Sequence, residues 1–389
     1  MRVLVSTTAN DGHFGPLVPL ARAAALAGHD VRVAAPASYA PAVQRTGLLH
    51  IPFADPPTEL IGPVMARLPT MSFAEADATV VREVFGRIDA QSALPALSVA
   101  LQAWRPDVVV REPAELGSLA VAERAGVPHV QVAIGMTELI RILTVQLVGP
   151  VTELAQLAGL PDDSLVDALA GEPIISPVPE LLDRAGDGAF HPGAVAFRFQ
   201  GEAPAGSRAP LPVWGDAELP LVYVTFGSVT GSLPPFAGVF QQALDGLAEL
   251  PVRVFMTVGR HVDPAGIGTV PANARVESWW PQADVMPEAA LVLGHGGFGT
   301  TMGAIAVGVP QVVAPIFTSD QVVNARHVEA VGAGRAVAPG SDVVARACRE
   351  VPAVLADPAY RTGAQAVATA IEELPPVADI VSAIERLAR

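Results

Sequence analysis

The sequence predicts an α/β protein with two domains, each a doubly wound parallel sheet. Apolar runs of strand length alternate with segments of helical periodicity, from Arg2 to Ile134 and again from Leu221 onward. This alternation is typical of parallel sheets with helices on both faces. Between the two series, the stretch from Gln200 to Leu219 is rich in Gly and Pro, as linkers are. The predicted division is a first domain at 1–203, a linker at 204–220 and a second domain at 221–389.

The first series begins with strand 2–7 and a helix that carries Pro16 and Pro19 in its first turn and ends at Gly28. We expect the following elements next: strand 31–35, helix 40–46, strand 48–53, helix 94–104, strand 107–110, helix 115–125 and strand 129–134. Two stretches, 56–90 and 134–185, lack a clear period, and we expect loops and short helices there. Their Met and Phe side chains suit an adaptable binding pocket, although such residues are more often ordinary core.

The second series shows the same alternation. Its expected elements are strand 221–226, helix 236–250, strands 252–258, 275–278, 290–293 and 311–314, and a final helix at 377–388.

Composition excludes several classes of protein. The net charge is −15, and every basic residue is Arg, so the chain should repel nucleic acid and anionic membranes. It contains no uninterrupted apolar stretch long enough for a membrane span, and its start lacks the apolar region of a signal peptide. A single cysteine, Cys348, allows neither an internal disulfide nor a cysteine metal cluster. We therefore expect a cytoplasmic protein.

Two loops in the second half place polar residues directly after predicted strands. The run His295-Gly296-Gly297-Phe298-Gly299-Thr300-Thr301 follows strand 290–293 and precedes a helical segment. Glycines in such a turn let the backbone approach a ligand, and the N–H groups at a helix start favour an anion, most often phosphate. Asp320 and Gln321 follow strand 311–314, and both loops should face one ligand. A tight turn that serves only close packing would need the same glycines, so the glycine turn alone does not distinguish a binding site from a structural turn.

Together these stretches resemble the nucleotide-sugar signature of family 1 glycosyltransferases. The resemblance rests on Trp279-x-Pro281-Gln282, His295-Gly-Gly-x-Gly-Thr, Gly308-Val-Pro310, Pro315, Asp320-Gln321 and Asn324-Ala325, in this order and spacing over about forty-five residues. It implies the GT-B fold, in which two Rossmann-like domains face each other across a cleft and the last helix crosses back to the first domain. It also implies a nucleotide-diphosphate sugar as co-substrate, no other cofactor, and a hydrophobic natural-product aglycone as acceptor.

The same resemblance implies roles for particular residues. Ser228 matches the family's diphosphate-binding serine. Only one of Trp279 and Trp280 can stack on the nucleobase, because adjacent residues of a strand face opposite ways, and the family motif selects Trp279. Asp320 and Gln321 would hydrogen-bond the sugar. The complete set of expected donor-binding residues is Ser228, Trp279, Gln282, His295, Gly296, Gly297, Gly299, Thr300, Asp320 and Gln321, and Thr301 would add a second hydroxyl.

His13 is the candidate general base, because imidazole titrates close enough to neutral pH to take the proton of an acceptor hydroxyl. Without the resemblance, a structural histidine that caps a turn or packs beside it is a commoner finding than a catalytic base. The resemblance at Gly12-His13 favours the catalytic role instead. A carboxylate would hold the imidazole in the required tautomer. Glu112 follows strand 107–110, where the family usually has Asp. Two interpretations of Glu112 stay open. It could be the carboxylate partner of His13, or it could form an ion pair with Arg111 at the surface.

Two departures from the family pattern bear on the donor. Phe298 and Gly299 replace the Trp and Asn of the plant version, which weakens an inference to glucose as the donor sugar. Gly303 stands where many members of the family have a Glu that binds both ribose hydroxyls, which favours dTDP over UDP. The sequence contains no Asp-x-Asp, so we expect no metal ion to bridge the diphosphate. The resemblance therefore predicts an inverting, metal-independent transferase of a dTDP-deoxysugar.

Other functions compete with this prediction. NAD binding is disfavoured, because Asp11-Gly12-His13-Phe14-Gly15 is not G-x-G-x-x-G and no carboxylate ends the second strand. A GT-B epimerase or nucleotide-sugar hydrolase, or a catalytically silent partner of another transferase, would share the donor signature. The sequence leaves open a homodimer, the aglycone, the sugar and O- or C-attachment.

Overall fold

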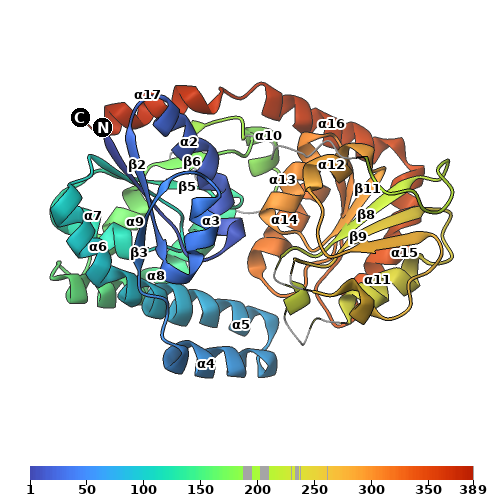
Figure 1. Ribbon diagram of the computed structural model, residues 1–389, viewed down its shortest axis with the longest axis horizontal. Coiled ribbons are helices and arrows are strands. Elements are labelled where there is room, and N and C mark those ends of the chain that lie inside the picture. Colours follow the sequence, from blue (N-terminus) through green and yellow to red (C-terminus); the bar gives the residue numbers. More distant parts are fainter. Residues whose placement is uncertain are drawn as a thin grey trace. The chain divides into compact units, whose positions relative to one another are not determined.

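The computed structural model describes residues 1–186, 195–201, 210–228, 230–232, 236, 238–260 and 262–388. The chain divides into two compact units, the first formed by 1–177, 189–201 and 374–389 and the second by 178–188 and 202–373. Each unit is built on one parallel sheet, with helices on both of its faces (Figure 1). The predicted fold class, two doubly wound α/β domains, is confirmed.

The first sheet has seven strands in the order β3-β2-β1-β4-β5-β6-β7, and every neighbouring pair is parallel. The strands are β1 (Arg2–Ser6), β2 (Asp30–Pro36), β3 (Leu49–Phe53), β4 (Val108–Arg111), β5 (His129–Val132), β6 (Ile174–Ser176) and β7 (Val195–Arg198). The strand order reverses between β1 and β4. In doubly wound sheets ligands bind beside the carboxyl ends of strands at such a switch point.

The first unit contains helices that cover its sheet and further helices that pack mainly on one another. These are α1 (Asp11–Phe14), α2 (Val18–Leu26), α3 (Ala40–Gln44), α4 (Thr58–Arg67), α5 (Phe73–Thr79), η4 (Val80–Asp89), α6 (Ala90–Trp104), α7 (Gly117–Ala125), α8 (Thr137–Ala158), α9 (Ser164–Gly171) and α17 (Val377–Leu387). Val3 and Val5 of β1 pack with α2 and α17, whereas Leu4 packs with α6 and α7, as strand alternation requires. The last helix, α17, lies beside α2 in this first unit (Figure 1), as expected.

The expectation of loops and short helices in 56–90 and 134–185 is wrong for much of both stretches. α8 alone runs for 22 residues and includes Pro150. α5, η4 and α6 form one continuous helical run, in which η4 has π-helical winding. Tertiary packing overrides the weak local signal, because η4 and α8 lie in such close contact that a Cβ on Gly86 would be 2.7 Å from the Cβ of Pro150.

The second sheet has six parallel strands in the order β10-β9-β8-β11-β12-β13. They are β8 (Leu221–Thr225), β9 (Arg253–Thr257), β10 (Ala274–Glu277), β11 (Leu291–Gly294), β12 (Gln311–Val313) and β13 (Gly334–Ala336). The helices of this unit are α10 (Glu180–Asp183), α11 (Val239–Leu247), α12 (Gln282–Val285), α13 (Phe298–Ala306), α14 (Ser319–Ala330), α15 (Val343–Ala356) and α16 (Pro358–Glu372). Its switch point lies between β8 and β11.

The predicted linker lies partly outside the described residues, since 202–209 are not among them. Farther along the same stretch, Trp214 packs against Phe255 of β9, with 5.3 Å between the ring centroids, and donates a hydrogen bond to the carbonyl of Asn273. These contacts attach the end of the stretch to the second unit.

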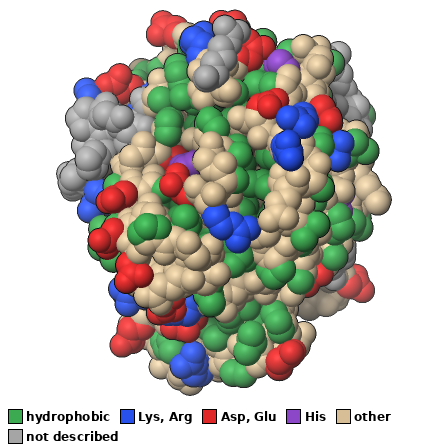
Figure 2. Space-filling model, turned by 90° about the vertical axis from the view of Figure 1, so that its left-hand side faces the viewer, with side chains coloured by type: hydrophobic (Ala, Val, Ile, Leu, Met, Phe, Trp, Pro, Cys, Tyr) green, Lys and Arg blue, Asp and Glu red, His purple; other side chains and the backbone are tan. Residues whose placement is uncertain are grey.

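One face of the molecule shows how the surface charges are distributed (Figure 2). Arginine side chains stand in small separate groups there, among acidic and hydrophobic side chains. Among the described residues, no helix combines the length and the apolar composition that a membrane crossing requires.

Candidate active site

His13 and Glu112 lie together at the switch point of the first sheet. His13 is in the short helix α1, which follows β1 and is capped by the Asn10 side chain. Glu112 directly follows β4, the neighbour of β1. The Nδ1 atom of His13 is 3.2 Å from Oε1 of Glu112, and Thr8 lies between the two, with its hydroxyl 3.0 Å from each of these atoms. The predicted pair is therefore brought together.

The hydrogen bonds at this pair assign the tautomer of His13. The Thr8 hydroxyl donates to Glu112, so its lone pairs face Nδ1 of His13. Nδ1 therefore carries the proton, and the lone pair of the neutral ring is on Nε2, as a general base requires.

Glu112 is fully buried, so the interpretation as a surface ion pair with Arg111 is wrong. Burial alone would raise the pKa of Glu112, but His13 and the backbone N–H groups of Ala114 and Thr8 hold it below its ordinary value. Arg111 instead pairs with Glu172, and its Nη1 donates to the backbone carbonyls of Glu112, at 3.1 Å, and Glu115, at 2.9 Å. Arg111 thus holds the loop that carries Glu112.

The glycine turn of the second unit connects β11 to α13. Gly296 has a φ of +90°, and a Cβ on it would lie 2.8 Å from both the Gln321 carbonyl and a Val313 methyl group. The Asn324 side chain donates to the Gly296 carbonyl at 2.8 Å. The left-handed backbone and the close contact with α14 both require glycine at position 296.

His295 is enclosed by two further glycines of the same unit. Side chains on Gly227 and Gly297 would bring a Cβ within 2.8 Å and 2.5 Å of its ring, respectively. Burial of the imidazole, opposed by a smaller effect of the Thr225 backbone, lowers the pKa of His295 to about 4. The ring is therefore neutral at physiological pH and carries a single N–H group and no positive charge.

α13 begins at this turn, with Gly297 as its N-cap and no side chain to cap it. Its first N–H groups consequently lack partners within the helix. A Cβ on Gly299 would meet nothing within 4 Å, so the space beside this residue is open. Thr300 accepts a hydrogen bond from Gln282 at 3.2 Å, whereas Thr301 is fully buried and does not add the expected second hydroxyl. The helix start thus has the geometry of an anion site.

Ser228 and Trp279 lie at the same edge of the second sheet. Ser228 is exposed after β8, next to Gly227 with its φ of +81°. Trp279, past the end of β10, is 44% exposed, whereas Trp280 packs into the core against Phe255. The two tryptophans therefore differ as expected, and only Trp279 presents a face that a nucleobase could cover.

Asp320 and Gln321 occupy the first turn of α14 and differ in exposure. Gln321 is buried, and its amide oxygen accepts from the backbone N–H groups of Ile316, at 2.7 Å, and Phe317, at 3.2 Å. That oxygen stabilises its own loop. Asp320 is half-buried and retains accessible surface.

Some residues of these sites belong to no recognisable sequence motif. Thr8 bridges His13 and Glu112, and the Arg260 guanidinium lies 3.5 Å from the ring centroid of Trp279. Thr8 and Arg260 each follow a strand, β1 and β9, so they could have been found only by asking which side chains the carboxyl edge of a sheet brings together.

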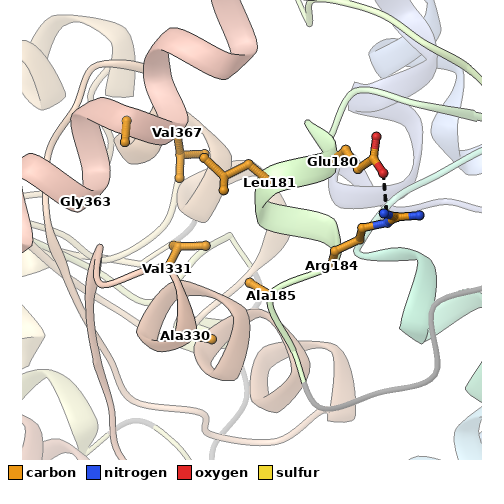
Figure 3. Close-up of a pocket in the computed structure, with 9 residues that line it drawn as sticks. Glu180, Leu181, Arg184, Ala185, Ala330, Val331, Gly363 and Val367 are labelled. Carbon is orange, nitrogen blue, oxygen red and sulfur yellow. Dashed lines mark ion pairs between the residues drawn. The ribbon is translucent and has the colours of Figure 1, made fainter.

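A groove of about 620 Å³ lies elsewhere in the second unit, between α10, α14 and α16 (Figure 3). Leu181, Val331 and Val367 line it, and Glu180 forms an ion pair with Arg184 at 2.8 Å on its rim. None of the predicted site residues lines this groove.

The chain is similar to proteins of antibiotic biosynthesis over most of its length. Residues 22–174 and 241–387 match the N-terminal and C-terminal domains of the erythromycin biosynthesis protein CIII-like family. The L-demethylnoviosyl transferase of Streptomyces niveus is 34% identical over 353 residues, which cover 89% of this chain and 87% of the relative. The tylactone mycaminosyltransferase of Streptomyces fradiae is 28% identical over 381 residues, with coverages of 87% and 82%.

Solved structures share the fold. The spinosyn rhamnosyltransferase SpnG, complexed with thymidine diphosphate, has a TM-score of 0.80 at 23% identity and matches 99% of this chain and all of its own.

Proposed function

This chain belongs to the natural-product branch of the family 1 glycosyltransferases, with the erythromycin biosynthesis protein CIII-like proteins, and on that premise we propose its donor, acceptor and mechanism. The donor is a dTDP-deoxysugar, and the acceptor is a hydroxyl of a hydrophobic aglycone. The sugar is transferred with inversion at the anomeric carbon. The observation that carries the mechanism is the buried Glu112 carboxylate, which lies 3.2 Å from Nδ1 of His13. Because Nδ1 faces this carboxylate, the basic Nε2 atom points away from Glu112 and is the one that would take the acceptor proton.

In the proposed reaction, the acceptor oxygen forms a bond to the anomeric carbon as the bond from that carbon to the diphosphate breaks. The acceptor proton passes to Nε2 of His13, and Glu112 stabilises the imidazolium that forms. The nucleoside diphosphate leaves with the bonding electron pair. Its charge is met by the N–H groups at the start of α13 and by hydrogen bonds from neutral His295 and from Ser228.

The nucleoside and the sugar would be held by the same sheet edge. The exposed face of Trp279 stacks on the base, and Asp320 with the amide group of Gln321 binds sugar hydroxyls. Gln282 fixes the Thr300 hydroxyl beside the diphosphate. The thymidine diphosphate complex of SpnG supports a dTDP donor.

We expect transfer to be independent of metal ions. The sequence contains no Asp-x-Asp that could bridge a metal ion to the diphosphate, and we expect the N–H groups at the start of α13 to meet the charge of the diphosphate instead. Initial rates should therefore be equal with EDTA and with added Mg²⁺. A strict requirement for Mg²⁺ would mean that the diphosphate is held in another way.

We also expect tighter binding of dTDP than of UDP, by roughly one to two orders of magnitude. Without a carboxylate at Gly303, a ribose 2′-hydroxyl would be left unpaired at a cost of about 1 to 3 kcal/mol. Burial of the thymine methyl group near Trp279 would add roughly 0.8 kcal/mol. Competitive titration of the wild-type protein with the two nucleotides measures the difference, and equal or tighter binding of UDP would contradict it.

Gly303→Glu should narrow the preference for dTDP, and Gly303→Ala is the matched control. A Cβ at this position meets the Met286 sulfur at 3.0 Å, so both variants require the same small shift of a flexible side chain. Only the glutamate adds a partner for the ribose hydroxyls. If Gly303→Ala narrowed the preference for dTDP over UDP by the same amount, the effect would come from packing and not from the added carboxylate.

The proposed activity is tested by mass spectrometry of products from dTDP- and UDP-sugars with a panel of hydrophobic aglycones. Free sugar or an epimer formed without acceptor would instead indicate a hydrolase or epimerase. Calorimetry that detects no nucleotide binding would indicate a catalytically silent partner of another transferase.

A further inference from the structure

The π-helical segment η4 places an aromatic ring against the candidate base. π-helical turns are rare and occur frequently at functional sites. One side of η4 is closed, because Gly86 packs directly on Pro150 of α8. Phe85, one residue earlier, contacts His13, with 5.5 Å between the two ring centroids. The side of η4 that carries Phe85 is therefore the side that faces the base.

Asp89 lies four residues after Phe85, slightly less than one turn of a helix whose hydrogen bonds join residues five apart, so it stands near the same side of η4. Its Oδ1 atom is buried and has no hydrogen-bond partner among the described residues. Burying a carboxylate oxygen without a partner is costly, so such an atom calls for an explanation. Asp89 has no role in the proposed reaction.

The charges that act on the pKa of Asp89 belong to the candidate site. Burial, followed by the charge of Glu112, raises the pKa of Asp89 to about 7; Glu115 adds to this effect, and His13 opposes it. His13 approaches from α1, and both glutamates come from the loop between β4 and α7. Asp89 consequently changes its charge in the pH range in which a histidine base also titrates.

The elements around η4 carry other charges. Arg87 of η4 pairs with Glu83 of the same helix and with Glu153 of α8, and these charges are partly exposed. The remaining charged residues of η4 and of the helices packed against it are Arg82 on η4, Glu59 and Arg67 on α4, Glu75 and Asp77 on α5, and Glu138 and Arg141 on α8. The pKa of Asp89 responds chiefly to Glu112, His13 and Glu115 instead.

We propose that Asp89 is a second carboxyl of the His13 site and that its charge sets the basicity of His13. This inference rests on the proposed role of His13 as general base. Since the charge of His13 lowers the pKa of Asp89, ionised Asp89 must by the same interaction raise the pKa of His13. Ionised Asp89 therefore strengthens the base and stabilises the imidazolium, whereas protonated Asp89 does neither. It is a positioning residue that acts through His13 and contacts neither substrate.

The direct test is an NMR titration of the His13 imidazole in the substrate-free protein, with its signal assigned by His13→Gln. In the wild type, His13 should titrate in two coupled steps, because Asp89 ionises in the same range. In Asp89→Asn it should titrate in one step, with its midpoint lower by about one pH unit. Glu83→Gln is the matched control, since it removes one exposed charge from the same segment and should leave the His13 titration unchanged.

A His13 titration that is identical in the wild type and in Asp89→Asn would overturn the proposal. If Asp89→Asn fails to fold, the carboxyl carbon of Asp89 is titrated in the wild type and in His13→Gln. Its midpoint should rise when the histidine charge is removed, and an unchanged midpoint would overturn the proposal equally. Both measurements are made without substrate, so they remain decisive even if the protein transfers no sugar.

The pH profile of kcat/KM for the acceptor separates this role from a merely structural one. In Asp89→Asn the acid limb should move to lower pH by about one pH unit, because a weaker base loses its proton earlier. The plateau should fall for the same reason, while nucleotide binding stays constant. A uniform loss of activity with an unmoved acid limb would indicate structural damage only and contradict the proposal.

Discussion

Replacing His13 by alanine should lower the rate of sugar transfer by roughly 10²- to 10⁴-fold, the usual contribution of a general base. The acceptor oxygen would then attack while still carrying its proton, or release it to water. Binding of the nucleotide should be nearly unchanged, because His13 and the donor-binding residues belong to different units. Steady-state kinetics give the rate, and calorimetry with dTDP gives the binding.

The acidity of the acceptor provides an internal control for this variant. An acceptor phenol that is already ionised at the assay pH needs no base, so it should lose much less activity than an aliphatic alcohol. Glu112→Gln should reduce transfer less than His13→Ala, because the imidazole remains while its tautomer and charge are less well supported. Near wild-type turnover of His13→Ala with an alcohol acceptor would remove His13 from the mechanism.

The sequence predicts the parts of the fold that local patterns determine. Strands such as β8 and β11 are buried on both faces and appear as short apolar runs, so their positions are correct to within about a residue or two. The turn at Gly296 and Gly297 is predictable for a similar reason, since the residue types report the backbone shape directly. The parallel order of the sheets then places His13 and Glu112 at one edge.

Contacts between distant segments account for what the sequence does not predict. α8 contains Pro150 within a long helix, and this residue packs on Gly86, which lies 64 positions earlier. The positions of Thr8, Arg260 and Asp89 next to their partners likewise depend on which segments the fold brings together. A single sequence shows the residue types but not these neighbours, so their roles emerge only from the structure.

Arg111→Met should destabilise the protein by about 3 to 5 kcal/mol, the usual cost of leaving one member of a buried ion pair without its partner. The side chains of Arg111 and Glu172 are both fully buried, and Nε of Arg111 donates to Oε1 of Glu172 at 3.0 Å. His129 donates to the same Glu172 oxygen at 2.7 Å. Chemical denaturation at neutral pH measures the loss in the free energy of unfolding. A loss below about 1 kcal/mol is what an exposed ion pair contributes, and it would contradict the prediction for a buried pair.

The double variant Arg111→Met and Glu172→Leu tests the origin of this cost. It removes both buried charges and replaces them with apolar groups, so it should recover most of the stability lost in the single variant. A double variant that is no more stable than the single one would show that the unpaired Glu172 charge is not the origin of the loss. In either variant the Glu112 loop loses two hydrogen bonds from Arg111, so sugar transfer should stay low even where stability returns.

The pH dependence of Arg111→Met follows from the same charges. Burial alone would raise the pKa of Glu172, but Arg111 and His129 hold it below its ordinary value of 4.5. A carboxyl group with a lowered pKa stabilises the fold above its ordinary pKa, and this contribution is lost as the pH falls through its folded value. Burial would lower the pKa of His129, but Glu172 and Glu123 raise it above 6.5. The contribution of His129 to the stability of the fold is therefore complete below pH 6.5 and is lost at higher pH.

The difference in stability between wild type and Arg111→Met should therefore be largest above pH 4.5 and should shrink in acid as Glu172 takes up a proton. A difference that stays constant from neutral pH into the acid range would show that the variant loses packing rather than an ion pair.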